Sequence, residues 1–122
     1  MATLTVNLTL TSSDASSDVL SLAATDTLTT ANPHIGISRQ SITSGGSQQI
    51  IAAGTAGSLF VYVKNCNTSG TGTVVLANDA AAGLGVLNNG EFAFIPVDRA
   101  KGLELEAVGA DCEVEYAYWT RG

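Results

Sequence analysis

The sequence predicts one all-β domain over residues 1–122, a β-sandwich or barrel of about nine to ten short antiparallel strands. At least six segments alternate apolar and polar residues with a period of two, and none has the helical period. Turn-forming Gly, Asn, Ser and Pro separate these segments at intervals of roughly 8 to 12 residues. Hydrophobic residues make up 45% of the chain and charged residues 13%, a composition that suits strands and turns.

Two strands are expected in the N-terminal quarter. Residues 3–10 alternate strictly and predict a half-buried strand. Its apolar face would carry Leu4, Val6, Leu8 and Leu10. After a Ser-rich loop, residues 19–30 predict a second strand, with a bend near Thr25 and Asp26. The segment 31–36 contains Pro33, which cannot donate to a strand ladder, and it predicts a change of chain direction.

The middle of the chain predicts further strands at 37–43, 48–54, 58–65 and 73–79. The strand at 58–65 gives the strongest signal, because both of its faces are largely apolar, as in the middle of a sandwich. One face would carry Leu59, Val61 and Val63, and the other Phe60, Tyr62 and Lys64. Residues 80–85 are small and flexible, and they predict a loop or one helical turn.

The C-terminal part predicts a hairpin and a closing strand. Residues 88–90 form the turn that leads into a strand at 91–97, with Phe92 and Phe94 on one face and Phe94 buried. Pro96 is expected to end the pairing. The strand at 103–108 would turn Leu103 and Leu105 inward and Glu104 and Glu106 outward, and residues 111–120 form the last strand.

Charge and cysteine content narrow the class of protein. The net charge is −6, and the five Lys and Arg residues are too few and too scattered to neutralise a run of phosphates, so direct nucleic-acid binding is not expected. No segment reaches the roughly 20 apolar residues of a membrane span, and residues 1–14 lack the charged and long apolar regions of a signal peptide, so none is expected there. Synthesis in a cytosol would keep Cys66 and Cys112 as free, partly buried thiols; the alternative is a disulfide between them across the sheet.

Candidate catalytic groups have simpler structural explanations. His34 is the sole histidine and lies in no nucleophile motif. The pairs Glu104 with Glu106 and Glu113 with Glu115 have the spacing of a carboxylate dyad, but they also fit the solvated faces of outer strands. Asp14 and Asp18 lack the dense ligand spacing of a calcium loop. We therefore expect no enzyme activity, no catalytic residue, no metal and no cofactor.

Aromatic residues near the C-terminus could form a contact surface. Alternation places Trp119 on the opposite face from Tyr116 and Tyr118, so the three cannot share one platform. Core packing is the simpler use for the tyrosines, whereas Trp119 is the best candidate for an exposed contact.

Three segments carry a resemblance to a known group of proteins: "SLFVYVKNCNTSGTGTVVLAN", "LNNGEFAFIPVDRAKGLELEA" and the terminal "EVEYAYWTRG". Their order of strands and turns resembles small structural proteins of tailed bacteriophages. The segment "NLTLTSSDASSDVLSLAATDTLTT" looks similar to the N-terminal part of small virion proteins of marine and cyanobacterial phages. The resemblance covers most of the chain but includes no invariant catalytic motif.

The resemblance implies a jelly-roll-like sandwich that acts as a capsid decoration or cement protein on the outside of the assembled phage head. The implied partner is the major capsid protein, and self-association would give a homotrimer on the capsid surface after synthesis in the bacterial host cytoplasm. Plausible contact residues are Thr3, Thr5, Asn7 and Trp119. The alternatives are a tail, neck or fibre component, a carbohydrate-binding β-sandwich module and, last, a hydrolase.

Overall fold

The computed structural model describes residues 2–31, 36–54, 57–78 and 80–122. Within them the chain forms ten strands and no helix, which confirms the predicted all-β class. No membrane-spanning helix is therefore found in the described part of the chain. The strands are β1 (Ala2–Ser12), β2 (Leu20–Thr30), β3 (Ser38–Ile42), β4 (Ser47–Ile51), β5 (Ser58–Asn65), β6 (Thr73–Ala77), β7 (Gly83–Leu87), β8 (Phe92–Asp98), β9 (Leu103–Val108) and β10 (Cys112–Thr120).

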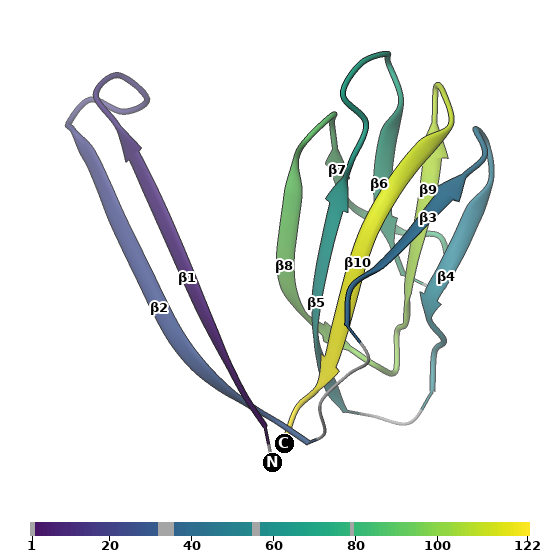
Figure 1. Cartoon of the computed structure of the whole chain (residues 1–122), viewed down its shortest axis with the longest axis horizontal. Helices are drawn as coiled ribbons and strands as arrows, with labels where there is room; N and C mark the ends of the chain where they lie inside the picture. Colours follow the sequence, from purple (N-terminus) through teal and green to yellow (C-terminus); the bar gives the residue numbers. More distant parts are fainter. Residues whose placement is uncertain (1, 32–35, 55–56, 79) are drawn as a thin grey trace.

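Eight of these strands form a sandwich of two four-stranded sheets (Figure 1). The front sheet has the order β3-β10-β5-β8, and the back sheet has the order β4-β9-β6-β7. Successive strands cross from one sheet to the other, except that β6 and β7 form a hairpin within the back sheet. This is the strand arrangement of an eight-stranded jelly roll.

The core lies between the two sheets and is built almost entirely from aliphatic side chains. Alternation along β5 turns Leu59, Val61 and Val63 into the core, as the sequence predicts. Along β9, Leu103 and Leu105 point inward while the intervening glutamates point outward, which is also confirmed. The remaining core side chains are Ile42, Ile51, Val74, Leu76, Leu87, Val97, Ala107, Cys112 and Val114.

One buried polar side chain ties the front sheet to the back sheet. Asn65 is fully buried at the end of β5. Its Nδ2 donates to the carbonyl oxygen of Leu87 at 3.1 Å, and its Oδ1 accepts from the backbone N–H of Asn67 at 3.1 Å. An unpaired amide would be costly in the core. These bonds therefore hold the end of β5 against the end of β7 and against Asn67 in the loop that follows β5.

The expected loop or helical turn at residues 80–85 is wrong for residues 83–85, because Gly83–Leu87 forms the edge strand β7, whereas residues 80–82 do form a loop. The small residues gave no alternation from which a strand could be predicted. The pairing partner supplies the missing information: β6 offers a free edge, and Val75 pairs with Val86 across it. Hydrogen bonding along that edge stabilises β7 as a strand, although its small residues have no preference for strand conformation.

The prediction that Phe94 of β8 is buried in the core is also wrong. Val61 of β5 pairs directly with Ile95, so Ile95, together with Ala93 and Val97, faces the core. Phe92 and Phe94 share a face, as predicted, but that face is the outer one. Both faces of this strand are apolar, so alternation alone could not say which of them is buried.

Pro96 does not end the pairing of β8, contrary to expectation. It pairs with Phe60, and the strand continues to Asp98. The front sheet ends at β8, so this is an edge strand, and an edge strand tolerates a residue that lacks an N–H donor.

The two N-terminal strands form a separate two-stranded sheet, here called the arm (Figure 1). Every residue of β1 from Ala2 to Ser12 pairs with a residue of β2, and β2 runs without interruption through Thr25 and Asp26, where a bend was expected. The prediction that residues 3–10 are half-buried fails toward the tip, because Leu8 and Leu10 are exposed. Alternation predicts a two-faced strand whether or not a core covers one face.

Candidate functional site

The arm has one apolar and one polar face. Residues directly opposite each other in an antiparallel pair lie on the same face. Leu4 pairs with Leu28 and Leu10 with Leu22, which groups the leucines on one face. The other face is almost entirely hydroxyl and amide groups, namely Thr3, Thr5, Asn7, Thr9, Thr11, Ser21, Thr25, Thr27 and Thr29, with Ala23.

The apolar face is covered at the base of the arm and bare toward its tip. Thr30, at the base, is buried, whereas the exposed fractions are 44% for Leu8, 46% for Leu10 and 42% for Leu22. A two-stranded ribbon buries little of its own surface and is marginal in water without further packing. The arm therefore presents apolar surface that the rest of this chain does not cover.

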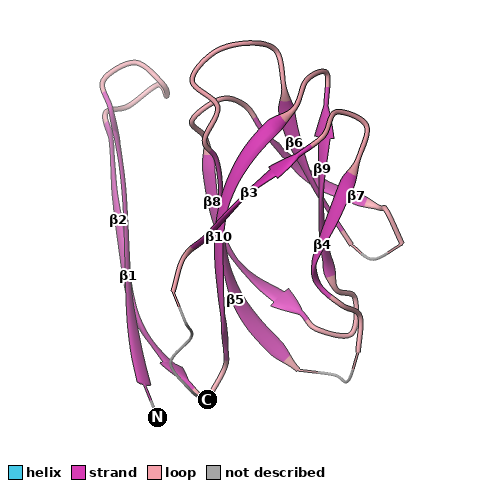
Figure 2. Ribbon diagram, turned by 45° about the vertical axis from the view of Figure 1, so that its right-hand side comes forward, coloured by secondary structure: helices cyan, strands magenta, loops and turns pink. Residues whose placement is uncertain are grey.

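The C-terminal residues fasten the arm to the sandwich. Thr30 forms an antiparallel bridge with Arg121, and the N–H of Gly122 donates to the carbonyl oxygen of Thr29 at 2.8 Å. The N–H of Ala31 donates to the carbonyl oxygen of Thr120 at 2.9 Å. Figure 1 shows the arm leaving this base and diverging from the sandwich toward its tip, and Figure 2 shows that it lies on the side of the front sheet away from the back sheet.

The outer face of the front sheet, which faces the arm, carries a group of aromatic side chains. The rings of Phe60 and Phe94 are stacked with centroids 6.2 Å apart, and Trp119 lies 6.5 Å from Phe94. The guanidinium of Arg121 lies 4.7 Å from the centroid of Phe60, a cation–π geometry that helps to bury this ring. Phe92, the first residue of β8, extends the group away from the base of the arm and is 63% exposed. We call Phe60, Phe92, Phe94 and Trp119 the aromatic surface.

Polar groups beside the aromatic surface are paired with one another. Arg39 lies within 3.4 Å of Glu113 and 3.6 Å of Glu115. The hydroxyl of Tyr62 donates to Glu115 at 2.9 Å. Burial, with a smaller effect of this carboxylate, raises the pKa of Tyr62 to about 12. The pair Glu113 and Glu115, considered above as a possible dyad, thus binds one arginine.

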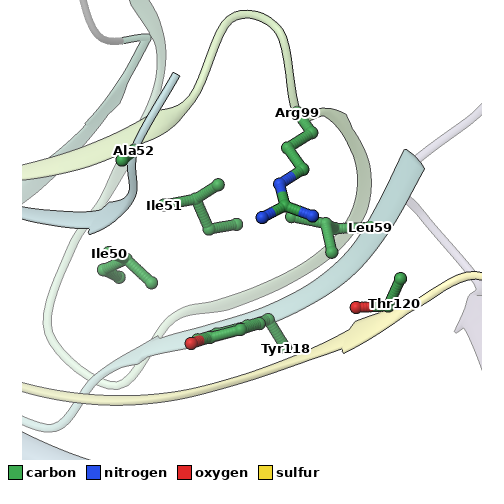
Figure 3. A pocket seen from close by; sticks show the side chains of 7 residues that line it. All are labelled: Ile50, Ile51, Ala52, Leu59, Arg99, Tyr118 and Thr120. Atoms are coloured by element: carbon green, nitrogen blue, oxygen red, sulfur yellow. The ribbon is translucent and has the colours of Figure 1, made fainter. Parts of the chain in front are cut away.

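A small cleft opens between the two sheets near the base of the sandwich (Figure 3). It has a volume of about 290 Å³ and is lined by Ile50, Ile51, Ala52, Leu59, Arg99, Tyr118 and Thr120. The walls are mostly aliphatic, with the guanidinium of Arg99 at one side (Figure 3). One exposed cation and two hydroxyl groups do not make a nucleophile with its base.

The contact residues expected from the sequence lie on two different sheets. Thr3, Thr5 and Asn7 lie on the polar face of the arm, where Asn7 accepts a hydrogen bond from Thr25 at 2.9 Å. Trp119 lies on the aromatic surface, on the face of β10 opposite Tyr116 and Tyr118, as alternation predicts. The structure therefore does not bring the four residues into one site.

Other candidate groups are dispersed. Cys112 is buried, Cys66 is partly buried, and both are free thiols, as expected; burial raises the pKa of the Cys112 thiol. Asp14 accepts a hydrogen bond from Ser12 in the loop at the tip of the arm. His34 and Pro33 lie outside the described residues. Within the described ranges, no three His, Cys, Asp or Glu residues cluster in a way that could hold a metal ion.

Comparison with known proteins assigns this chain to no family. No protein-family model matches the chain, and no curated protein matches it. A similar solved structure comes from work on Bacillus endospore appendages, described as a novel family of disulfide-linked pili. It is 18% identical, the similarity covers 75% of this chain and 95% of that chain, and the TM-score is 0.40. A similarity at this level supports no inference about function.

The sequence contained a signal for the arm that alternation alone did not reveal. Residues 2–31 include Asp14, Asp18 and Asp26 but no Lys or Arg, whereas all five basic residues lie in the sandwich. The two strands are also 11 residues long, longer than any strand of the sandwich. Uneven charge and unequal strand length together distinguish a projecting hairpin from a strand pair of the core.

Proposed function

We propose that this chain is a structural protein of a tailed-phage virion, a decoration protein that binds the outside of the assembled head and stabilises neighbouring capsomers. The observation that supports this most is the arm. It is a hairpin of two 11-residue strands that projects from the sandwich and exposes Thr3, Thr5 and Asn7 on its polar face. A compact jelly roll with a projecting hairpin is suited to attachment, with the sandwich outside and the arm in contact with a partner.

Multiplicity makes modest contacts sufficient for such a role. Each copy needs to bury only a small area, because a head offers many equivalent sites and a self-associated unit binds several of them at once. A protein that binds only the assembled shell stabilises it by mass action. The polar groups beside the aromatic surface, Arg39, Tyr62, Glu113 and Glu115, bind one another rather than converge on a substrate, which favours a structural role.

The polar face of the arm is the proposed contact with the major capsid protein. Thr3, Thr5 and Asn7 present hydroxyl and amide groups that donate and accept hydrogen bonds without a charge to desolvate. Copies would gather as homotrimers at the local threefold axes of the capsid lattice, since cyclic assemblies match such axes. A tail, neck or fibre position is the alternative, because the arm would serve attachment there equally well.

Carbohydrate binding is a second candidate, and the exposed ring of Phe92 beside Phe94 and Trp119 is the observation that favours it. Sugars stack on aromatic side chains but also need directional polar partners. Binding on a glycan array that is lost in Phe92→Ala would support this candidate over the first.

An add-back experiment tests the decoration proposal. Heads that lack the protein are mixed with the purified chain, sedimented, and challenged with heat or osmotic shock. We expect the wild type to sediment with heads and to raise their resistance, and Thr3→Lys/Thr5→Lys to do neither. The matched control, Leu84→Lys/Val86→Lys, adds the same charge at exposed positions of β7 and should behave as wild type. Binding to isolated tails but not to heads would contradict the proposal.

A further inference from the structure

We propose that the apolar tip of the arm, formed by Leu8, Leu10 and Leu22, is a docking element whose partner is the aromatic surface of a second copy of this chain. The inference concerns contact between copies, goes beyond the proposed attachment to a phage head, and stands or falls independently of it. Four observations lead to it: the orientation of the arm, its reach, its charge, and the area that it offers.

The orientation of the arm makes its own sheet the first partner to consider. Thr30 pairs directly with Arg121, so their side chains lie on the same side. Arg121 lies over Phe60 on the outer face of the front sheet. The apolar face of the arm, which includes Thr30, is therefore continuous with the outer face that carries the aromatic surface.

The reach of the arm excludes its own sheet as the cover for two of the three tip leucines. Thr30, Arg121 and Ser58 lie at one level, because Arg121 also bonds to Ser58. The aromatic surface ends at Phe92, which pairs with Lys64, six residues along β5 from Ser58. Leu22 lies eight residues along β2 from Thr30 and pairs with Leu10, whereas Leu8 pairs with Ala24, six residues from Thr30. Since strands rise by about the same amount per residue, a closed arm would place Leu8 level with Phe92 but carry Leu10 and Leu22 beyond the aromatic surface.

Charge favours the front sheet of another copy over another arm. The arm carries three aspartates and no basic residue, so two arms packed face to face would gather six carboxylates without a counter-charge. The outer face of the front sheet carries Arg39, Lys64 and Arg121, but Arg39 is already paired with Glu113 and Glu115. In the described part of the chain no carboxylate forms an ion pair with Lys64, which lies beside Phe92 and opposite Glu115. Lys64 and Arg121 are therefore the cations that an acidic arm can meet on this face.

The contact area of one arm is too small for a stable complex, so every arm in an assembly must contact the aromatic surface of another copy. Strands of 11 residues are about 36 Å long, and a two-stranded ribbon is about 10 Å wide, so one whole face, including the base that is already covered, measures about 350 Å². The contact of one arm therefore buries less than about 700 Å² counted on both partners, below the 1,200 Å² or so of a stable interface. A closed assembly, in which each copy gives one arm and receives one, makes at least two such contacts and leaves no arm without a partner. The proposed homotrimer is one such assembly.

The test uses full-length protein and three variants, with mass measured by light scattering after gel filtration at micromolar concentration. The arm variant is Leu8→Thr/Leu10→Thr/Leu22→Thr, which keeps the β-propensity of exposed positions. The surface variant is Lys64→Glu/Phe92→Thr. The control, Leu84→Thr/Val86→Thr, removes exposed apolar side chains from β7 of the back sheet. Circular dichroism verifies that each variant retains the wild-type strand signal.

We expect the wild type and the control to be oligomers of one defined mass, and the arm and surface variants to be monomers. A monomeric wild type, or a control that dissociates equally, would overturn the inference. Dissociation by the arm variant alone would also overturn it and indicate arm-to-arm packing.

Discussion

Two leucines show how strongly the place of a residue in the sandwich decides its contribution to stability. Leu103 of β9 is 0% exposed between the sheets, whereas Leu84 of the edge strand β7 is 67% exposed. Truncation of a buried leucine removes transfer free energy and leaves a cavity, which typically costs about 2–5 kcal/mol. We expect Leu103→Ala to lower the free energy of unfolding by about this amount and Leu84→Ala by about 0.5 kcal/mol or less. Urea denaturation measures both losses; equal midpoints would contradict the difference in burial, and a larger loss in Leu84→Ala would mean that the faces of the back sheet are inverted.

Because of Tyr62, the free energy of unfolding should change with pH in the alkaline range. Its pKa is raised to about 12, first by burial and then by Glu115, from an unfolded value of about 10. The folded state binds the phenolic proton more tightly, so the stabilisation is complete below pH 10 and is lost as the pH rises through about 12. We expect Tyr62→Phe to lose less stability over this window than the wild type.

The variant Glu115→Gln separates the two causes of that shift. It removes the charge that accepts the hydroxyl hydrogen bond but keeps the burial, which is the larger effect. The pKa of Tyr62, measured by absorbance titration of the phenolate, should move part of the way toward 10. A return to the full unfolded value would show that burial contributes nothing.

At the scale of elements, the arm and the sandwich should differ in local stability. The strands of the sandwich share the buried core, whereas β1 and β2 pair only with each other beyond the base of the arm. Regions with few buried apolar contacts open at low free energy. In a monomeric variant we expect the amides of residues 2–12 and 20–30 to exchange with solvent long before those of β5. Equal protection in hydrogen-exchange mass spectrometry would contradict an arm that lacks packing of its own.

Individual elements also show what the sequence could predict and what it could not. The strand at 58–65 was predicted with its exact bounds, because a central strand needs apolar residues on both faces and Leu59 to Val63 supply them. For β8, with apolar residues on both faces, only the pairing with β5 decides that Ile95 is inside and Phe94 outside. For β7, the free edge of β6 decides that Gly83–Leu87 is a strand at all. Local patterns predict strands, whereas burial depends on partners that are distant in sequence.

At the scale of the whole molecule, the same limit applies to the candidate site. The sequence identified Trp119 and the residues Thr3, Thr5 and Asn7 as contact candidates, and the structure places them on an exposed arm and on an aromatic outer face. Alternation in the arm is indistinguishable from alternation in the sandwich, because a strand has the same period whether its partner is its own core or another molecule. Only the separate sheet formed by β1 and β2 shows that the arm lies apart from the core of the sandwich.

The measurement that tests the central proposal most directly is electron cryo-microscopy of phage particles that contain this chain. The proposal predicts jelly-roll density on the outer surface of the head, in several copies around local symmetry axes, with the polar face of each arm against the major capsid protein. The further inference predicts that Leu8, Leu10 and Leu22 lie on the aromatic surface of a neighbouring copy. Density for the chain on the tail alone, or on no part of the particle, would contradict the proposed decoration of the head.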